Sequence, residues 1–330
     1  MLLVVLGHTM TGSTTGAEES FLFNIVWSLQ MPLFILISGY VTRYSRKIDN
    51  ISALWNYIKR RTLAYMLPWL VWSILIRGVI LGQHDYLNIK WLLWHMDSGY
   101  WFLATIWTIS MVFGISAFLS EKTSKTSQLK QQIFTLIFYV LGMAALAGIG
   151  LIAGLSFFSI KLTLYYMPFF FAGYLYGQYR DRIMGNRIGR TVIDSIVAVC
   201  LAVWLSIISR TYLFSLPDNI SGIALRALSS ITGCVAICGL CKGLTQIGQK
   251  QSGGGTEFLA WSGIHSLEIY LSHYLLLNLM KQASLPMVTS VQGLAIIMVN
   301  YLLTISLTVF AVKALRTNYL MRLVLFGNKG

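Results

Sequence analysis

The chain has 330 residues, of which 56% are hydrophobic and only 11% are charged. Soluble domains carry roughly 25% charged residues, so this composition excludes an ordinary soluble protein and indicates an all-helical integral membrane protein. The formal net charge of +14 is compatible with nucleic-acid binding, but basic residues beside membrane spans usually record orientation. We therefore expect a lipid bilayer and no nucleic acid as partner.

The chain begins with a short apolar run, LVVLGHTM at 3–10. At about 1.5 Å per residue this run covers only part of a bilayer core of about 30 Å. We interpret residues 1–9 as the outer half of a first span whose cytoplasmic half is missing, which places His8 toward its outer end. Nine longer runs follow and predict a single domain, 1–330, of about ten transmembrane helices. These runs are 21–41, 62–82, 100–120, 131–155, 161–178, 191–211, 221–241, 258–280 and 290–312.

The segments between these runs alternate in charge. One set contains most of the 25 basic residues, while the other contains several acids and few bases. By the positive-inside rule the basic set is cytoplasmic. Both termini are then expected in the cytoplasm of a bacterial cell, with the protein in its inner membrane.

The first basic segment is unusually rich in cations, with six between Arg43 and Arg61. Arginine and lysine bind polyphosphates, such as that of coenzyme A, through charge-assisted hydrogen bonds. The alternative is orientation together with binding of anionic lipid. The candidate binding residues are Arg43, Arg46, Lys59, Arg60 and Arg61.

Ionisable side chains within spans are costly and are candidates for function. The alternative for His8 is a histidine that is hydrogen-bonded between helices, and for Arg77 and Arg226 it is a side chain extending to the headgroups. Glu268 and His273 lie five positions apart, about 140° around one helix, and need not share a site. The candidates are His8, Arg77, Asp194, Arg226, Glu268 and His273, with Gln30, Trp101 and Tyr270 as polar or amphipathic neighbours.

Three cysteines, Cys234, Cys238 and Cys241, have a spacing that is known from iron–sulfur proteins. They lie in a continuous apolar helical run, SSITGCVAICGLC, where small residues usually pack helices together. Cluster ligands normally lie in loops that wrap the metal. We therefore expect helix packing and no metal site.

Six motifs in order resemble the acyltransferase-3 family of membrane O-acyltransferases, especially its fucose 4-O-acetylase-like branch. They are LLVVLGHT, LQMPLFILISGY, IKRRTLAYMLPW, YWFLATIW, MPFFFAGYLYG and SGIHSLEIYLSH. The chain departs from the family pattern in two ways. The charged cytoplasmic stretch that usually precedes Gly-His is missing, and Gln30 replaces a histidine often found before Met-Pro-Leu-Phe, so this position cannot titrate near neutral pH.

The resemblance implies transfer of an acetyl or other acyl group from cytoplasmic acyl-CoA to a sugar hydroxyl of a cell-envelope or exported polysaccharide. No permanently bound cofactor is implied. An imidazole, with a pKa near 6.5, suits His8 for accepting the hydroxyl proton. Gln30, Trp101 and Arg77 are candidate donors to the developing oxyanion. With coenzyme A inside and His8 toward the outside, the acyl arm would thread into the helix bundle.

Two other classes of protein remain as alternatives. A transporter or flippase of a polysaccharide precursor or small anion would line its path with charges such as Arg77 and Glu268. No inverted repeat is evident in the sequence to support it. A membrane scaffold without a site would tolerate replacement of His8.

Overall fold

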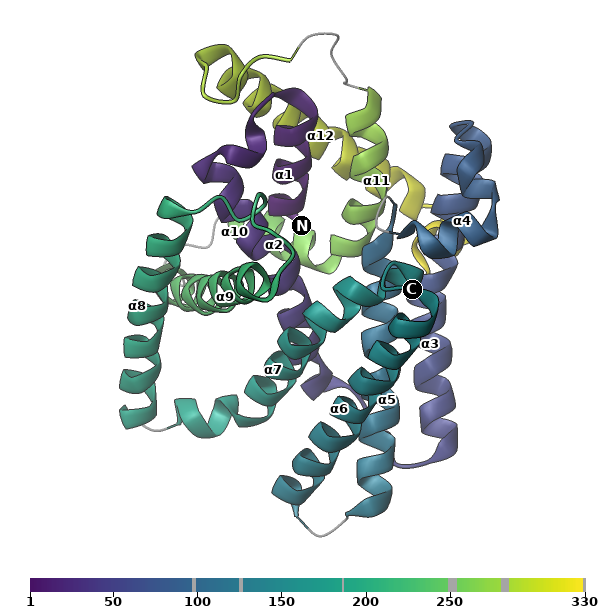
Figure 1. Cartoon of the computed structure of the whole chain (residues 1–330), viewed down its shortest axis with the longest axis vertical. Coiled ribbons are helices and arrows are strands. Elements are labelled where there is room, and N and C mark those ends of the chain that lie inside the picture. Colours follow the sequence, from purple (N-terminus) through teal and green to yellow (C-terminus); the bar gives the residue numbers. More distant parts are fainter. Residues whose placement is uncertain (97–98, 125–126, 186, 249–253, 280–284, 329–330) are drawn as a thin grey trace. The chain divides into compact units, whose positions relative to one another are not determined.

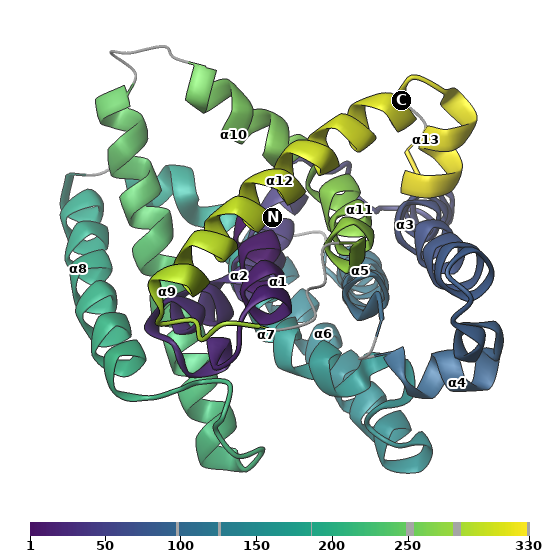
Figure 2. The same cartoon turned by 90° about the horizontal axis from the view of Figure 1, so that it is seen from above.

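The structure is a computed structural model that describes residues 1–96, 99–124, 127–185, 187–248, 254–279 and 285–328. These residues form helices and short turns, with one isolated β-bridge between Thr15 and Met287. The chain divides into two compact units, which are described separately below. Figures 1 and 2 label their helices. The first unit comprises Met1–Tyr40 and Ala172–Ala314, and the second comprises Val41–Phe171 and Leu315–Gly330.

The first unit is built around the short amino-terminal helix. Helix α1 packs against α11, and both views show it beside α12 as well. Ser13 of α1 accepts a hydrogen bond from the Asn300 amide of α12 at 2.9 Å. The helices are α1 (Leu2–Ser13), α2 (Phe21–Val41), the later part of α7 (Ile160–Met184), α8 (Arg187–Arg210), α9 (Ile220–Gly248), α10 (Gly254–Ile264), α11 (Ser266–Leu279) and α12 (Val291–Arg316).

A buried asparagine joins α2 to the end of α8. The Asn24 side chain is 0% exposed. Its amide donates to the carbonyls of Ile208 and Thr211 at 3.1 and 2.8 Å, and its oxygen accepts from the Leu213 N–H at 3.0 Å. Lipid offers no hydrogen-bond partners, so these bonds satisfy backbone groups where α8 ends.

Glycines allow close helix contacts within the first unit. A Cβ on Gly239 of α9 would lie 2.4 Å from Cγ1 of Val197 on α8, as the small-residue pattern around Cys234 predicts. The contact of α7 with α2 is tighter, because a Cβ on Gly173 would lie 1.9 Å from the Leu36 carbonyl oxygen. Only glycine permits this approach of the two backbones.

The second unit is organised around α5. Helix α5 packs against α6 and α3, and α13 packs against α3. Tyr139 of α6 donates to the Met167 carbonyl at 3.1 Å, and Trp72 donates to the Leu325 carbonyl at 2.8 Å. The helices are α3 (Ile51–Leu70), its π-helical continuation Val71–Ile80, α4 (Ile89–Trp94), α5 (Trp101–Thr123), α6 (Gln128–Ala153), the first part of α7, and α13 (Tyr319–Phe326).

Two expected elements differ from the structure. The run expected at 62–82 begins at Ile51, because Asn50 caps the helix by accepting the Ala53 N–H at 2.8 Å. Three cations expected in a loop therefore lie on α3. The run expected at 258–280 is two helices, α10 and α11, with a break at His265. There the His265 ring contacts Glu268 in the first turn of α11, where an acid is favourable.

Seven helices in the described part of the chain are long and apolar enough to cross a membrane. The protein is therefore a multi-pass membrane protein. Helix α1 is apolar but shorter, and α7, α10 and α11 are not among the seven, so the count of about ten spans stays a prediction. The seven are Phe21–Tyr44, Ile51–Ile80, Trp101–Thr123, Gln128–Ala153, Ile188–Arg210, Ile220–Gly243 and Val291–Arg316.

Replacing Gly173 by alanine should destabilise the protein, because the added methyl group collides with backbone rather than with a flexible side chain. Overpacking of this kind costs about 1–3 kcal/mol. The measurement is thermal unfolding in detergent. Gly148→Ala is the control, since a Cβ there has nothing within 4 Å and alanine favours a helix. Equal unfolding temperatures for the two variants would contradict the predicted contact.

Candidate functional site

Three of the six ionisable residues expected within spans each contact a side chain of the opposite kind, so that an acid is paired with a base. Such pairing is how membrane proteins accommodate ionisable groups between helices. The remaining three are His8, His273 and Arg77. The pairs are Glu268 with His265 at 2.5 Å, Arg226 with Asp218 at 2.7 Å, and Asp194 with Lys242 at 3.7 Å.

His8 and His273 lie together in the first unit, although the sequence analysis did not pair them. Their ring centroids are 5.4 Å apart and their planes are tilted by 35°. Tyr274 contacts the His8 ring edge-on at 5.7 Å. The packing of α1 on α11 creates this contact. The sequence signal for His273 is the last residue of the SGIHSLEIYLSH motif, but only the tertiary structure shows its partner.

The hydrogen bond of Nδ1 determines which ring nitrogen of neutral His273 carries the proton. Its side chain is 1% exposed, and Nδ1 lies 2.9 Å from the Ile269 carbonyl oxygen. A carbonyl only accepts, so in the neutral ring Nδ1 carries the proton and Nε2 carries the lone pair. Nε2 is buried and has no hydrogen-bond partner among the described residues.

Gln30 of α2 lies beside the helical turn that carries His8. A Cβ on Gly7 would lie 2.9 Å from Cγ1 of Val26 and 3.1 Å from Oε1 of Gln30. Glycine thus lets α1 approach α2 at this point. Oε1 of Gln30 is also buried without a hydrogen-bond partner in the described part of the structure. Two buried polar atoms without partners therefore lie on either side of α1, on α2 and α11.

Arg77 belongs to the second unit, where aromatic rings surround it. The guanidinium carbon lies 4.5 Å from the centroid of the Tyr86 ring and 5.8 Å from that of Tyr100. Nε donates to the Gln83 side chain at 3.1 Å, and the residue is 8% exposed. The structure thus holds this charge against neighbouring side chains of the same unit.

Trp101 is also in the second unit, at the first position of α5. Its ring stacks on Tyr166 of α7, with centroids 5.8 Å apart and planes at 13°. It directly follows Tyr100, which contacts Arg77. The structure therefore groups Trp101 with Arg77 in one unit and His8 with Gln30 in the other. The catalytic role of these four residues stays a prediction.

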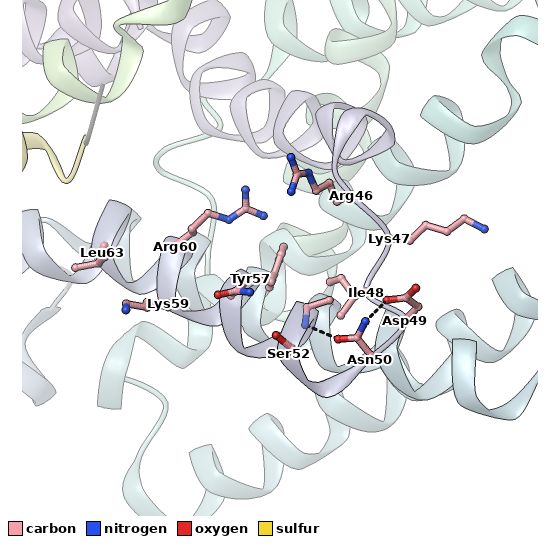
Figure 3. Close-up of a pocket in the computed structure, with 12 residues that line it drawn as sticks. Arg46, Lys47, Ile48, Asp49, Asn50, Ser52, Tyr57, Lys59, Arg60 and Leu63 are labelled. Atoms are coloured by element: carbon pink, nitrogen blue, oxygen red, sulfur yellow. Dashed lines mark hydrogen bonds between the residues drawn. The ribbon is translucent and has the colours of Figure 1, made fainter.

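The second unit has a cavity of about 670 Å³ where the chain enters α3. Figure 3 shows cationic side chains from the segment before α3 and from α3 itself. Among the described residues that line the cavity Asp49 is the single acid, and it accepts a hydrogen bond from Asn50 at 2.8 Å. The cations that line the cavity are Arg46, Lys47, Lys59 and Arg60.

Three of the five candidate polyphosphate-binding residues line this cavity, namely Arg46, Lys59 and Arg60. Arg61 instead donates to the Tyr65 hydroxyl at 3.1 Å. Successive helix positions point about 100° apart, which directs Arg61 away from its neighbour. The guanidinium of Arg43 lies over the Tyr44 ring at 5.2 Å. Neither of these two arginines lines the cavity.

The described helices define a multi-pass membrane protein, and comparison with known families gives its class. The model of the acyltransferase-3 family, an acyltransferase domain, matches residues 1–312. The chain therefore belongs to this family. Comparisons with curated proteins and with solved structures give no significant match.

The cavity should bind pyrophosphate through its arginines. In neutral-lipid nanodiscs, the double variant Arg46→Gln, Arg60→Gln should bind pyrophosphate at least about tenfold more weakly, because each charge-assisted hydrogen bond contributes about 1.5–3 kcal/mol. Isothermal titration calorimetry measures the affinity. The double variant Lys90→Gln, Lys161→Gln removes equal charge outside the cavity and should bind like the wild type. Equal weakening by both double variants would contradict a specific site.

Proposed function

We propose that the protein is an O-acetyltransferase of the fucose 4-O-acetylase-like branch. It moves an acetyl group from cytoplasmic acetyl-CoA to a hydroxyl of a cell-envelope or exported polysaccharide. Membership of the acyltransferase-3 family supports acyl transfer. The observation that carries the proposal is the contact of His8 with a second buried histidine whose Nε2 has no partner among the described residues. The family gives no support to the transporter alternative.

In the proposed reaction His8 is the general base. It removes the proton of the sugar hydroxyl while the hydroxyl oxygen forms a bond to the thioester carbonyl carbon. The tetrahedral intermediate then breaks its carbon–sulfur bond, and the coenzyme A sulfur takes the proton from His8. The products are the acetyl ester and free coenzyme A, and His8 returns to its neutral state.

The developing oxyanion requires hydrogen-bond donors. We propose the Arg77 guanidinium, the Trp101 indole N–H and the Gln30 amide for this role. The fixed position of Arg77 between Tyr86 and Tyr100 supports it, since a donor that is already held in place reorganises little during the reaction.

The donor would bind at the basic cavity, with its phosphates near Arg46, Lys59 and Arg60. Four lining cations against a single acid support an anionic ligand. Arg43 and Arg61, which contact tyrosines instead, would then contribute to the local positive charge. No permanently bound cofactor is part of this proposal.

We further propose about ten spans in a bacterial inner membrane with both termini cytoplasmic. The supporting observation is the distribution of basic residues among the connecting segments. The acyl arm then enters from the cytoplasm, and the sugar reaches His8 from the outer face.

Replacing His8 should abolish acetyl transfer. Cells that lack the gene should lose the O-acetyl signal of their surface polysaccharide in proton NMR spectra, and the wild-type gene should restore it. His8→Ala should not restore it, because removal of a general base slows transfer by about 10²–10⁴-fold. Membranes that contain the wild-type protein should also release free thiol from acetyl-CoA when acceptor is present.

The control for this experiment is His84→Ala, which replaces a histidine of the second unit and should restore the signal. Expression of each variant is checked in the membrane fraction. An acetyl signal that never depends on the gene would rule out polysaccharide acetylation, and full activity of His8→Ala would rule out His8 as the base.

The direction of transfer predicts the labelling of introduced cysteines. In a background without native cysteines, Gly12→Cys on α1 should react with an impermeant maleimide added outside the cell. Ser45→Cys, before the basic cavity, should react only after permeabilisation. Both positions are exposed. Protection of Gly12→Cys until permeabilisation would contradict transfer across the bilayer.

A further inference from the structure

His273 has a lone pair that the hydrogen bonds of the first unit do not use. The ring is almost completely buried, and Nδ1 is engaged with the Ile269 carbonyl. Burying an acceptor without a partner costs free energy, and native proteins rarely tolerate this without a reason. A histidine that only filled space between helices would gain by being apolar.

Of the three aromatic rings in contact with the His273 ring, the His8 ring is the nearest by centroid distance. The Tyr270 and Tyr274 rings lie farther from the His273 ring, at 6.0 and 6.4 Å against 5.4 Å for His8. In the structure Nε2 of His273 is not hydrogen-bonded to His8. At a centroid separation of 5.4 Å, a turn of the His8 ring that points one of its nitrogens at Nε2 would bring the two atoms to about 3 Å, the normal length of a hydrogen bond. His8 is only partly buried.

We infer that His273 is the positioning residue for His8, and that its Nε2 accepts a hydrogen bond from one ring N–H of His8. The inference rests on the proposed function and adds a residue that the sequence analysis left outside the site. His273 touches neither substrate in this role. It acts through His8 alone.

The hydrogen bond would determine which nitrogen of His8 is the base. A proton held between one nitrogen of His8 and Nε2 of His273 leaves the other nitrogen of His8 with its lone pair. That lone pair then faces the sugar hydroxyl. When His8 accepts the hydroxyl proton, its ring becomes positively charged and remains hydrogen-bonded to an acceptor. In a catalytic triad, the carboxylate is the acceptor that stabilises the charged histidine in this way.

Two amide substitutions of His273 separate its two ring nitrogens. Asparagine places its amide near the position of Nδ1 and can still donate to the Ile269 carbonyl, but it offers nothing at the position of Nε2. Glutamine is one bond longer and places its amide oxygen close to the position of Nε2. His273→Asn should therefore remove the positioning contact, and His273→Gln should preserve an acceptor there.

Steady-state kinetics with acetyl-CoA and polysaccharide acceptor provide the first test. His273→Asn should lower kcat by roughly 10- to 100-fold, as the loss of an orienting partner does elsewhere, with little change in KM for acetyl-CoA. His273→Gln should recover most of the lost kcat. Equal losses in both variants, wild-type kcat in His273→Asn, or a parallel fall in unfolding temperature for both would overturn the inference.

A second readout does not depend on activity. In protein labelled with ¹⁵N in the histidine rings, wild-type His8 should show a single neutral tautomer by solid-state NMR. His273→Asn should convert this signal to a mixture of tautomers. The signal is assigned to His8 by its absence from a His8→Gln sample. A single tautomer in both proteins would overturn the positioning role. A different outcome separates the two proposals. If wild-type His8 shows a single tautomer and His273→Asn converts it to a mixture, but the wild-type protein transfers no acetyl group, the proposed function fails while the contact between the histidines stands.

Discussion

Polar groups between the helices of a membrane protein must find their partners within the protein, because lipid provides none. Several polar groups of the described structure meet this constraint through bonds within one unit. Asn24 bonds three backbone groups at the end of α8, Tyr139 bonds a carbonyl of α7, and Arg226 pairs with Asp218. The bonds of Asn24 and Tyr139 join different helices. Those of Asn24 hold α2, which carries Gln30, against the end of α8.

Two of the buried polar atoms that have no partner among the described residues lie beside α1. Nε2 of His273 and Oε1 of Gln30 are buried without partners among the described residues, on the two helices that pack against α1. Gly7 permits the close approach of α1 to Gln30. The next residue, His8, contacts His273. A short apolar helix with a glycine and a histidine in sequence therefore brings two unused acceptors to the same turn.

The second unit places charge at both ends of one long helical segment. The continuous segment Ile51–Ile80 has 30 residues, which corresponds to a length on the order of 40 Å. The basic cavity surrounds its beginning, and Arg77 is held between tyrosines near its end. The cavity and Arg77 thus belong to the same continuous helical segment but to its opposite ends.

The sequence by itself determined the membrane class and the positions of most helices, because the length and spacing of hydrophobic runs follow directly from the order of the residues. The role of His8 stays a prediction. The sequence also predicted that Arg46, Lys59 and Arg60 belong together. It did not predict that α3 begins at Ile51, because the helix start depends on the cap by Asn50. Only the tertiary structure decided that His273 meets His8 and that Arg61 leaves the cavity. Those outcomes depend on which helix faces pack together, and periodicity within one helix does not specify the neighbouring helix.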